Sequence, residues 1–166
     1  LLFQFFFIFS YFQDGFAYAG EALTGKALGE GDRVLLNRTI RNLFKWGWGA
    51  AVLASAVFAL GFDVMINVLT NNQVLRDLAK TYYWWVLIIP LSSSAAFIWD
   101  GIFVGVTASK EMRNAMIISS LIVFLPTYYI SASFLGNNAL WFALNMFMIA
   151  RGLMMWVFWY RKSKSI

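Results

Sequence analysis

The segment from Trp84 to Glu111 constrains the fold of this chain more than any other. It is long and apolar, yet it contains Pro90, three consecutive serines at 92–94 and a single acid within the apolar stretch, Asp100. A carboxylate in the middle of a bilayer-length helix is costly unless it is neutralised, paired or hydrated. Such a residue is kept mainly where something charged binds or moves. The segment therefore predicts a membrane protein with a polar interior, and that interior is where we look for function.

Composition agrees with lipid as the surrounding solvent. Charged residues make up 13% of the 166 residues and hydrophobic residues 61%, whereas a soluble domain carries roughly 25% charged residues. Five spans of about 20–25 residues each would fill nearly the whole chain. We predict an all-α, polytopic transmembrane helix bundle that forms a single membrane domain, 1–166, with spans at approximately 1–28, 46–69, 82–108, 115–135 and 140–160.

The chain contains no cysteine and no histidine. Disulfide scaffolds, Cys/His metal sites and histidine-based catalysis are therefore excluded. Leu1 already lies inside an apolar run, and the basic start and short apolar core of a signal peptide are missing. We expect a fragment of a longer protein that lacks its N-terminal part.

Lysine and arginine are distributed unevenly over the predicted loops. Ten lie in the loops after the first and third spans and in the tail, whereas two lie in the opposite loops. The ten are Lys26, Arg33, Arg38, Arg41, Lys45, Lys110, Arg113, Arg161, Lys162 and Lys164, and the two are Arg76 and Lys80. This positive-inside bias predicts an integral plasma (inner) membrane protein with a cytoplasmic C-terminus. It also explains the net charge of +5 without a nucleic-acid partner.

Basic and apolar residues interleave between Arg33 and Lys45. This pattern is typical of an amphipathic segment on the membrane surface, and equally of the solvated start of the next spanning helix. Gly101-x-x-x-Gly105 predicts a close helix–helix contact. We predict Pro90 and the mid-span Pro126 as hinges, because proline removes a backbone donor and bends helices.

Four ionisable residues lie deep inside the predicted spans. Counting about ten residues inward from the cytoplasmic ends places Asp14, Asp100 and Arg151 within about 3 Å of one level. Glu21 shares a helical face with Asp14, closer to the cytoplasm. Since Arg151 can neutralise one acid, one or two carboxylates are left for a proton or Na⁺. We predict Asp100, Asp14 and Glu21 as coupling residues for H⁺ or Na⁺.

We further predict a substrate cavity lined by polar residues of the spans, namely Gln13, Tyr18, Ser93 and Arg151. No catalytic residue and no cofactor are expected, apart from the coupling ion itself, H⁺ or Na⁺.

Each of these residues also has a structural interpretation. Arg151 can lock the fifth span to a neighbouring helix, and Asp14 can bond a backbone group freed near a kink. Glu21 can reach the cytoplasmic interface or pair with Lys26. The serines at 92–94 can line a cavity or donate back to helix carbonyls. Interface-belt or packing roles explain four tryptophans: Trp84, Trp85, Trp156 and Trp159.

Three motifs together resemble the multidrug and toxic compound extrusion (MATE) family of transporters, in particular its DinF-like branch. The similarity to the eighth helix of that family lies in DGFAYAGEALTGKALG, residues 14–29. The similarity to the end of the tenth helix and the following loop lies in DGIFVGVT, residues 100–107, and in EMRN, residues 111–114. The similarity to the last turn and the twelfth helix lies in LGNNALW, residues 135–141, and in ARGL, residues 150–153.

The resemblance covers essentially the whole chain and implies the C-terminal lobe of a twelve-helix, two-lobed antiporter. It implies export of organic, cationic or amphiphilic compounds by alternating access, driven by inward H⁺ or Na⁺, and no enzymatic activity. The implied partners are the lipid bilayer, a small organic substrate and the missing N-terminal lobe of the same chain. Sodium-coupled members carry a cation-binding acid in the tenth helix, where Asp100 lies here.

Other functions stay open on the sequence alone. A lipid-linked sugar flippase of the same superfamily shares the architecture and differs in its cavity lining. A non-transporting membrane scaffold subunit would explain the glycine faces but not three charges at one depth. An intramembrane aspartyl enzyme would need Asp14 and Asp100 within hydrogen-bond reach, and no other motif supports it.

Overall fold

The computed structural model describes residues 1–163, so Lys164 of the predicted basic tail lies outside the described residues. Within residues 1–163 every regular element is helical, which confirms the predicted all-α bundle. In chain order the elements are α1 (Phe3–Gly29), α2 (Arg33–Leu69), α3 (Gln73–Thr81), α4 (Tyr83–Gly105), α5 (Ser109–Ile118), the π-helical segment η1 (Ser119–Phe124), α6 (Leu125–Leu135) and α7 (Asn138–Lys162).

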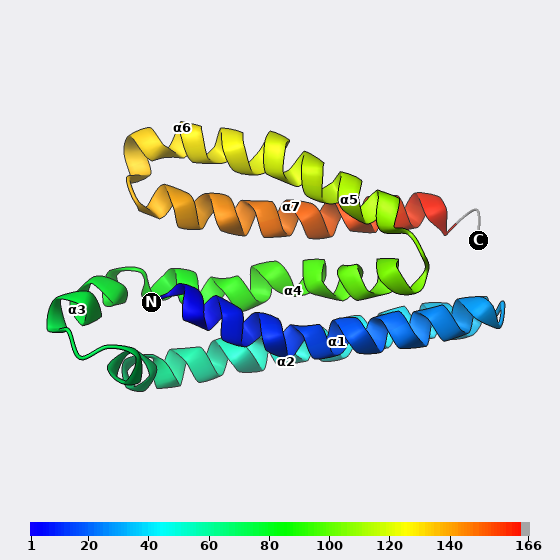
Figure 1. The fold of residues 1–166 in the computed structure, drawn as a ribbon, viewed down its shortest axis with the longest axis horizontal. Helices are drawn as coiled ribbons and strands as arrows, with labels where there is room; N and C mark the ends of the chain where they lie inside the picture. Colours follow the sequence, from blue (N-terminus) through cyan, green and yellow to red (C-terminus); the bar gives the residue numbers. More distant parts are fainter. Residues whose placement is uncertain (164–166) are drawn as a thin grey trace.

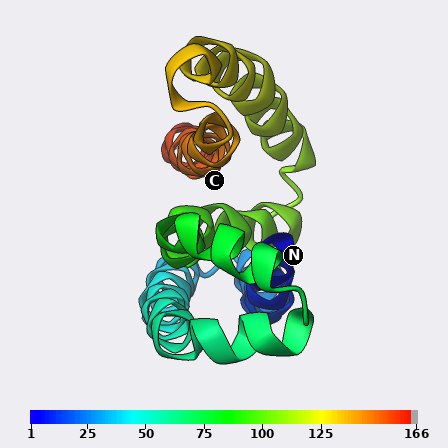
Figure 2. The ribbon, with the colours of Figure 1, turned by 90° about the vertical axis from the view of Figure 1, so that its left-hand side faces the viewer.

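Helix α4 is the centre of the bundle. Figures 1 and 2 show α1 and α2 on one side of α4 and α7 on the other, with α5 and α6 beyond α7 (Figure 1, Figure 2). Helices α1, α2 and α7 each make their most extensive contacts with α4. In α4, 67% of the apolar window is buried, against 17–33% in the other candidate spans. The segment that carries Asp100 is therefore the most enclosed helix of the chain.

Four helices are long and apolar enough to cross a membrane: α2, α4, the continuous segment Ser109–Leu135 and α7. These correspond to the second to fifth predicted spans, although α4 ends at Gly105, three residues before the predicted end of the third span at 108. Helix α1 has 27 residues but is not among the four, because polar residues interrupt its apolar sequence. The first predicted span, 1–28, therefore corresponds to a real helix whose crossing of the membrane stays a prediction.

Helix α2 resolves one of the alternatives left by the sequence. It is continuous from Arg33 to Leu69, and the side chain of Asp32 caps its start by accepting a hydrogen bond from the Leu35 N–H at 2.8 Å. A helix of this length spans about 55 Å, well beyond a hydrocarbon core of about 30 Å. The basic residues before position 46 are therefore the projecting first turns of the spanning helix rather than a separate surface segment.

Both prolines lie inside helical segments. Pro90 is enclosed in an unbroken α4, and the nearby Leu87 carbonyl accepts a hydrogen bond from Ser55 Oγ of α2 at 2.9 Å. Pro126 follows the π-helical segment η1 and occupies the first turn of α6. A π-bulge absorbs the clash that proline creates with the preceding turn. Pro126 thus follows an irregular helical segment whereas Pro90 lies in a continuous helix, and their role as hinges stays a prediction.

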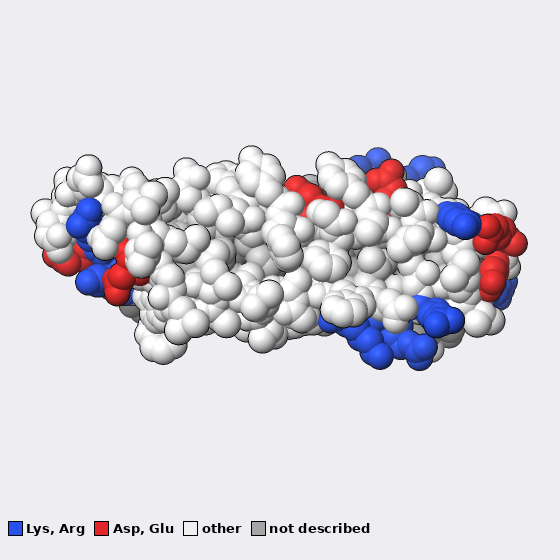
Figure 3. All heavy atoms as spheres, turned by 90° about the horizontal axis from the view of Figure 1, so that it is seen from below, with Lys and Arg blue, Asp and Glu red and all other residues white. Residues whose placement is uncertain are grey.

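The two ends of the bundle differ in charge. The α1–α2 turn, the α4–α5 connection and the C-terminal end of α7 meet at one end, and α3 lies at the other (Figure 1). These are the connections to which the sequence assigns the ten and the two basic residues. Figure 3 shows basic atoms gathered toward one end and a long uncharged stretch between the ends (Figure 3). This distribution matches a molecule whose middle lies in lipid.

Helices α1 and α4 approach each other through glycines. A methyl group added at Gly101 would overlap the carbonyl of Ala17, and one at Gly105 would overlap Thr24 Oγ1 and the carbonyl of Glu21. Only residues without a side chain let two backbones come this close. The close contact predicted from the glycine pair therefore exists, and its partner is α1.

Candidate functional site

An ion pair joins α4 to α7 in the middle of the bundle. Nη2 of Arg151 lies 2.7 Å from Oδ1 and 2.6 Å from Oδ2 of Asp100. The Arg151 side chain is 10% exposed and that of Asp100 is 23% exposed. Nε of Arg151 has no acceptor among the described atoms. The structural interpretation of Arg151 as a lock between helices is thus realised, and Asp100 is the acid that it neutralises.

Asp14 is the predicted coupling acid at this depth that is not part of the Asp100–Arg151 ion pair. It lies half-buried on α1, three residues before Ala17, whose carbonyl lies against Gly101, the residue after Asp100. Within residues 1–163 no hydrogen bond or ion pair of the Asp14 side chain is recorded. The site therefore combines two carboxyl groups with one guanidinium, so one carboxyl group has no basic partner within it. Of the three residues that the sequence placed at one depth, Asp100 and Arg151 are in contact, and Asp14 lies on α1, the helix packed against that of Asp100.

Glu21 and Tyr18 do not join this group. Both are exposed on α1, and the Tyr18 side chain is 70% exposed. Lys26 lies 3.9 Å from Glu30 in an ion pair, so the pairing of Lys26 with Glu21 that the sequence allowed is not the one recorded. Glu21 is thus available to groups outside the chain.

Gln13 belongs to the packing between helices rather than to an open cavity. Its Nε2 donates to Ser94 Oγ at 2.6 Å, and Ser94 Oγ donates to the carbonyl of Gly47 at 3.3 Å. These bonds connect α1, α4 and α2. Gln13 is fully buried, and its Oε1 has no donor among the described atoms. The amide therefore contributes a buried polar link with one acceptor left over.

Serines 92–94 show both behaviours considered from the sequence, since one donates back to a helix carbonyl and another lines a groove. Ser93 is fully buried and donates to the Ile89 carbonyl at 2.6 Å. Ser92 lines a groove, and its Oγ donates to Oδ1 of Asn145 on α7 at 2.6 Å. Asn145 in turn donates to the Trp141 carbonyl at 2.8 Å. Sequence reasoning did not single out Asn145 as a site residue, although an isolated amide in an apolar span was the available signal.

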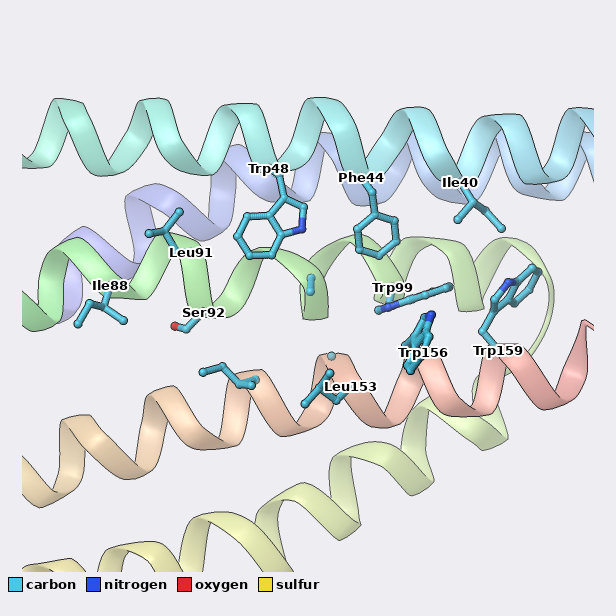
Figure 4. Close-up of a pocket in the computed structure, with 13 residues that line it drawn as sticks. Ile40, Phe44, Trp48, Ile88, Leu91, Ser92, Trp99, Leu153, Trp156 and Trp159 are labelled. Atoms are coloured by element: carbon cyan, nitrogen blue, oxygen red, sulfur yellow. The ribbon is translucent and has the colours of Figure 1, made fainter.

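A groove of about 670 Å³ opens between α2, α4 and α7 (Figure 4). Its lining is almost entirely apolar and consists of Ile40, Phe44, Trp48, Ile88, Leu91, Ser92, Ala95, Trp99, Ile149, Gly152, Leu153, Trp156 and Trp159. None of the predicted coupling or substrate-cavity residues is among them. Their chain neighbours Ser92, Trp99 and Gly152 are, because one residue along a helix turns the side chain by about 100°.

The described residues hold no group of three or more Asp, Glu, His or Cys side chains that could bind a metal ion. A carboxylate bonded through both oxygens to Arg151 has less capacity for Na⁺ than an unpaired one. Na⁺ at Asp100 therefore stays a prediction, and Asp14 is the acid with free acceptor atoms beside it.

Known proteins provide an independent view of the chain. Residues 1–130 match the model of the MatE family. DNA damage-inducible protein F of Escherichia coli (strain K12) is 36% identical over 152 residues, which cover 92% of this chain and 33% of that protein. The chain thus spans about a third of the length of this curated relative. No solved structure matches the chain at a significant level.

Proposed function

This chain belongs to the MatE family of membrane transporters, and from that premise we propose that it forms part of a cation-coupled antiporter. The antiporter would export organic, cationic or amphiphilic compounds by alternating access. The whole transporter would include the further length that the E. coli relative possesses. A C-terminal lobe is the part that this chain would supply.

The observation that supports the proposal is the excess carboxylate beside the Asp100–Arg151 pair. A charge in an interior of low dielectric interacts far more strongly with its surroundings than one in water. Asp14 has free acceptor atoms, and a proton or Na⁺ bound there would cancel the excess negative charge. A cationic substrate would be attracted by the same charge, so ion and substrate would exclude each other. Mutually exclusive occupancy is the basis of antiport.

Conformational coupling follows from where these groups lie. Asp14, Asp100 and Arg151 belong to α1, α4 and α7, so loss of one charge changes the forces between three helices. A ligand shifts a conformational equilibrium only through its different affinity for the two states. Protonation of Asp14 or Asp100 would favour the state in which the acids are poorly hydrated, and the ionised state would favour substrate. Pro90 and Pro126 are the proposed bending points.

The same proposal includes the orientation in the membrane. The protein would lie in the inner membrane. The end of the bundle that holds the α1–α2 turn and the C-terminus of α7 would face the cytoplasm, since basic residues concentrate at that end. A reporter fused after Ile166 that is active only in the cytoplasm would test this orientation. Activity of a periplasmic reporter at the same position would reverse it.

The coupling proposal is tested with Asp14→Asn and Asp100→Asn in the full-length protein reconstituted in liposomes. Efflux of a fluorescent organic cation is measured under a proton gradient and under a Na⁺ gradient. We expect Asp14→Asn to lose the dependence on the driving ion while the protein stays folded, because no partner of Asp14 is recorded. Asp63→Asn is the matched control, since Asp63 is exposed at 74% and pairs with Lys80 at 3.7 Å, away from the charged site.

Unchanged ion dependence in both Asp14→Asn and Asp100→Asn would overturn the proposed coupling role. Loss of transport in Asp63→Asn to the same degree would show that the assay reports general damage. A lipid-linked sugar flippase would show lipid scrambling in the same liposomes and no efflux of organic cations.

A further inference from the structure

The groove between α2, α4 and α7 has a composition that changes along its length. Toward the basic end of the bundle its side chains are mostly aromatic, with Phe44, Trp99, Trp156 and Trp159 near Ile40, and Trp48 lies farther toward the middle (Figure 4). Toward the middle of the bundle they are aliphatic, as Ile88 and Leu91 show in the same view. Phospholipids change in the same direction, from polar headgroup to hydrocarbon chain. Tryptophan is typical of the level at which that change occurs.

The aromatic end of the groove offers donors without protein acceptors. Trp85 donates from Nε1 to Asn138 at 2.9 Å, but within residues 1–163 no such bond is recorded for the indoles of Trp99, Trp156 or Trp159. Buried indole N–H groups usually find a partner. These groups face a space in which an ester or phosphate oxygen would supply one.

Two basic residues stand on the outer lip of this end. Arg41 and Gly47 lie three residues before and after Phe44, so they are turned about 60° from it in opposite directions. Gly47 faces α4, where an added methyl group would overlap Ile98. Arg41 therefore points away from α4, toward the surrounding lipid, and Lys45 lies next to it on that side. Both are exposed, and no ion pair of either is recorded within residues 1–163.

We propose that the groove binds one anionic phospholipid from the cytoplasmic leaflet. The phosphate group contacts Arg41 and Lys45, the ester region lies against Trp156 and Trp159, and one acyl chain follows the aliphatic part of the groove. The volume of about 670 Å³ lies in the range of cavities that hold ligands of moderate size, about 300–1,000 Å³.

Charge complementarity decides among the occupants. The lip carries two cations, and none of the described residues that line the groove is acidic, so an organic cation is disfavoured at this place. Free phosphate would leave the apolar length unfilled. An uncharged lipid would fill it without using Arg41 or Lys45. An anionic phospholipid satisfies both parts of the groove, and this binding is separate from the proposed ion coupling at Asp14.

The test is native mass spectrometry of the full-length protein with phosphatidylglycerol and phosphatidylcholine of identical acyl chains. We expect one retained lipid with a preference for phosphatidylglycerol. Arg41→Gln/Lys45→Gln should lower that preference about 25-fold, because each basic residue near a membrane surface contributes on the order of a factor of five. Lys110→Gln/Arg113→Gln removes the same charge from the α4–α5 region and should leave the preference unchanged.

A second variant tests the apolar part independently of charge. Leu153 lines the groove and its side chain is 58% exposed, so Leu153→Trp should fill the groove without burying a strained side chain. We expect this variant to lose the retained phosphatidylglycerol while Arg41 and Lys45 stay in place. Equal retention of the two lipids in the unmodified protein would overturn the proposal. An equal effect of the Lys110→Gln/Arg113→Gln control would also overturn the proposal. Unchanged lipid retention in Leu153→Trp would overturn it too, and this is the result expected if another helix of the full-length protein fills the groove.

Discussion

The two sides of α4 differ in how their surface is completed. At the α1–α4 contact, glycines bring the backbones together and Gln13 of α1 donates to Ser94 of α4 at 2.6 Å, while Asp100 of α4 pairs with Arg151 of α7. On the side of the groove, α2 and α7 leave about 670 Å³ unfilled by protein. The difference follows from the solvent. Charged and polar groups in a membrane need fixed protein partners, whereas apolar surface is satisfied by lipid and experiences no hydrophobic drive to close.

This comparison ranks substitutions by the kind of surface that they disturb. Removal of a partner from a charge should cost most, and overlap at the glycine contact should cost less. A neutral hydrogen bond between helices should cost less again, and an ion pair that reaches water should cost least.

Arg151→Met should have the largest effect on stability. It leaves Asp100 without its partner, and loss of one member of a buried pair costs about 3–5 kcal/mol. We expect about 3 kcal/mol, at the lower end, since the Asp100 side chain retains 23% exposure. The free energy of unfolding in mild detergent is the measurement. The double variant Asp100→Asn/Arg151→Met should regain most of the lost stability. If Arg151→Met unfolds within about 1 kcal/mol of the unmodified protein, the buried ion pair does not stabilise the bundle as argued.

Gly101→Ala should be the next most damaging change, by about 2 kcal/mol, because its methyl group overlaps the Ala17 carbonyl and the backbone of α1 must move. Gly49→Ala is the matched control in α2, since nothing lies within 4 Å of an added methyl group there. Alanine at that position should stabilise its helix by about 0.5–1 kcal/mol. Thermal unfolding of the two variants gives the difference directly, and equal behaviour would contradict the close α1–α4 contact.

Ser92→Ala tests the boundary between the two sides. It removes the 2.6 Å hydrogen bond to Asn145 that joins α4 to α7 at the groove. Hydrogen bonds between membrane helices contribute about 0.6 kcal/mol on average, and we expect a loss of that size in the same unfolding measurement. Ser133→Ala removes a hydroxyl that bonds only within its own helix, to the Ile130 carbonyl at 3.0 Å. A larger loss for Ser133→Ala than for Ser92→Ala would show that the interhelical bond has no special weight.

Glu111→Gln should have the smallest effect. Lys162 Nζ lies 2.8 Å from Glu111 Oε1, but the two side chains are 27% and 33% exposed. Ion pairs that reach water contribute about 0.2–1 kcal/mol, and salt screens them within about 10 Å at 0.1 M. We expect a loss below 0.5 kcal/mol that disappears in 1 M salt. A loss of stability equal to that of Arg151→Met would mean that the two ion pairs of α7 contribute equally despite their different burial.

Much of this arrangement follows from the sequence alone. Its apolar composition, its glycine pair at 101 and 105 and its uneven loop charges determine a helical membrane bundle, and they indicate which ends lie together. The level shared by Asp14, Asp100 and Arg151 also follows, because depth along a helix is simply residue count times rise.

The tertiary structure decided which of these residues meet. Arg151 pairs with Asp100 rather than Asp14, Gln13 turns into the packing between helices, and Ser92 rather than Ser93 lines the groove. Each choice depends on the rotation of a helix about its axis, where one residue changes the direction of a side chain by about 100°. Rotation is set by contacts between helices far apart in the chain, such as Ala17 against Gly101. Sequence fixes the depth of a membrane residue, and packing fixes the direction in which it points.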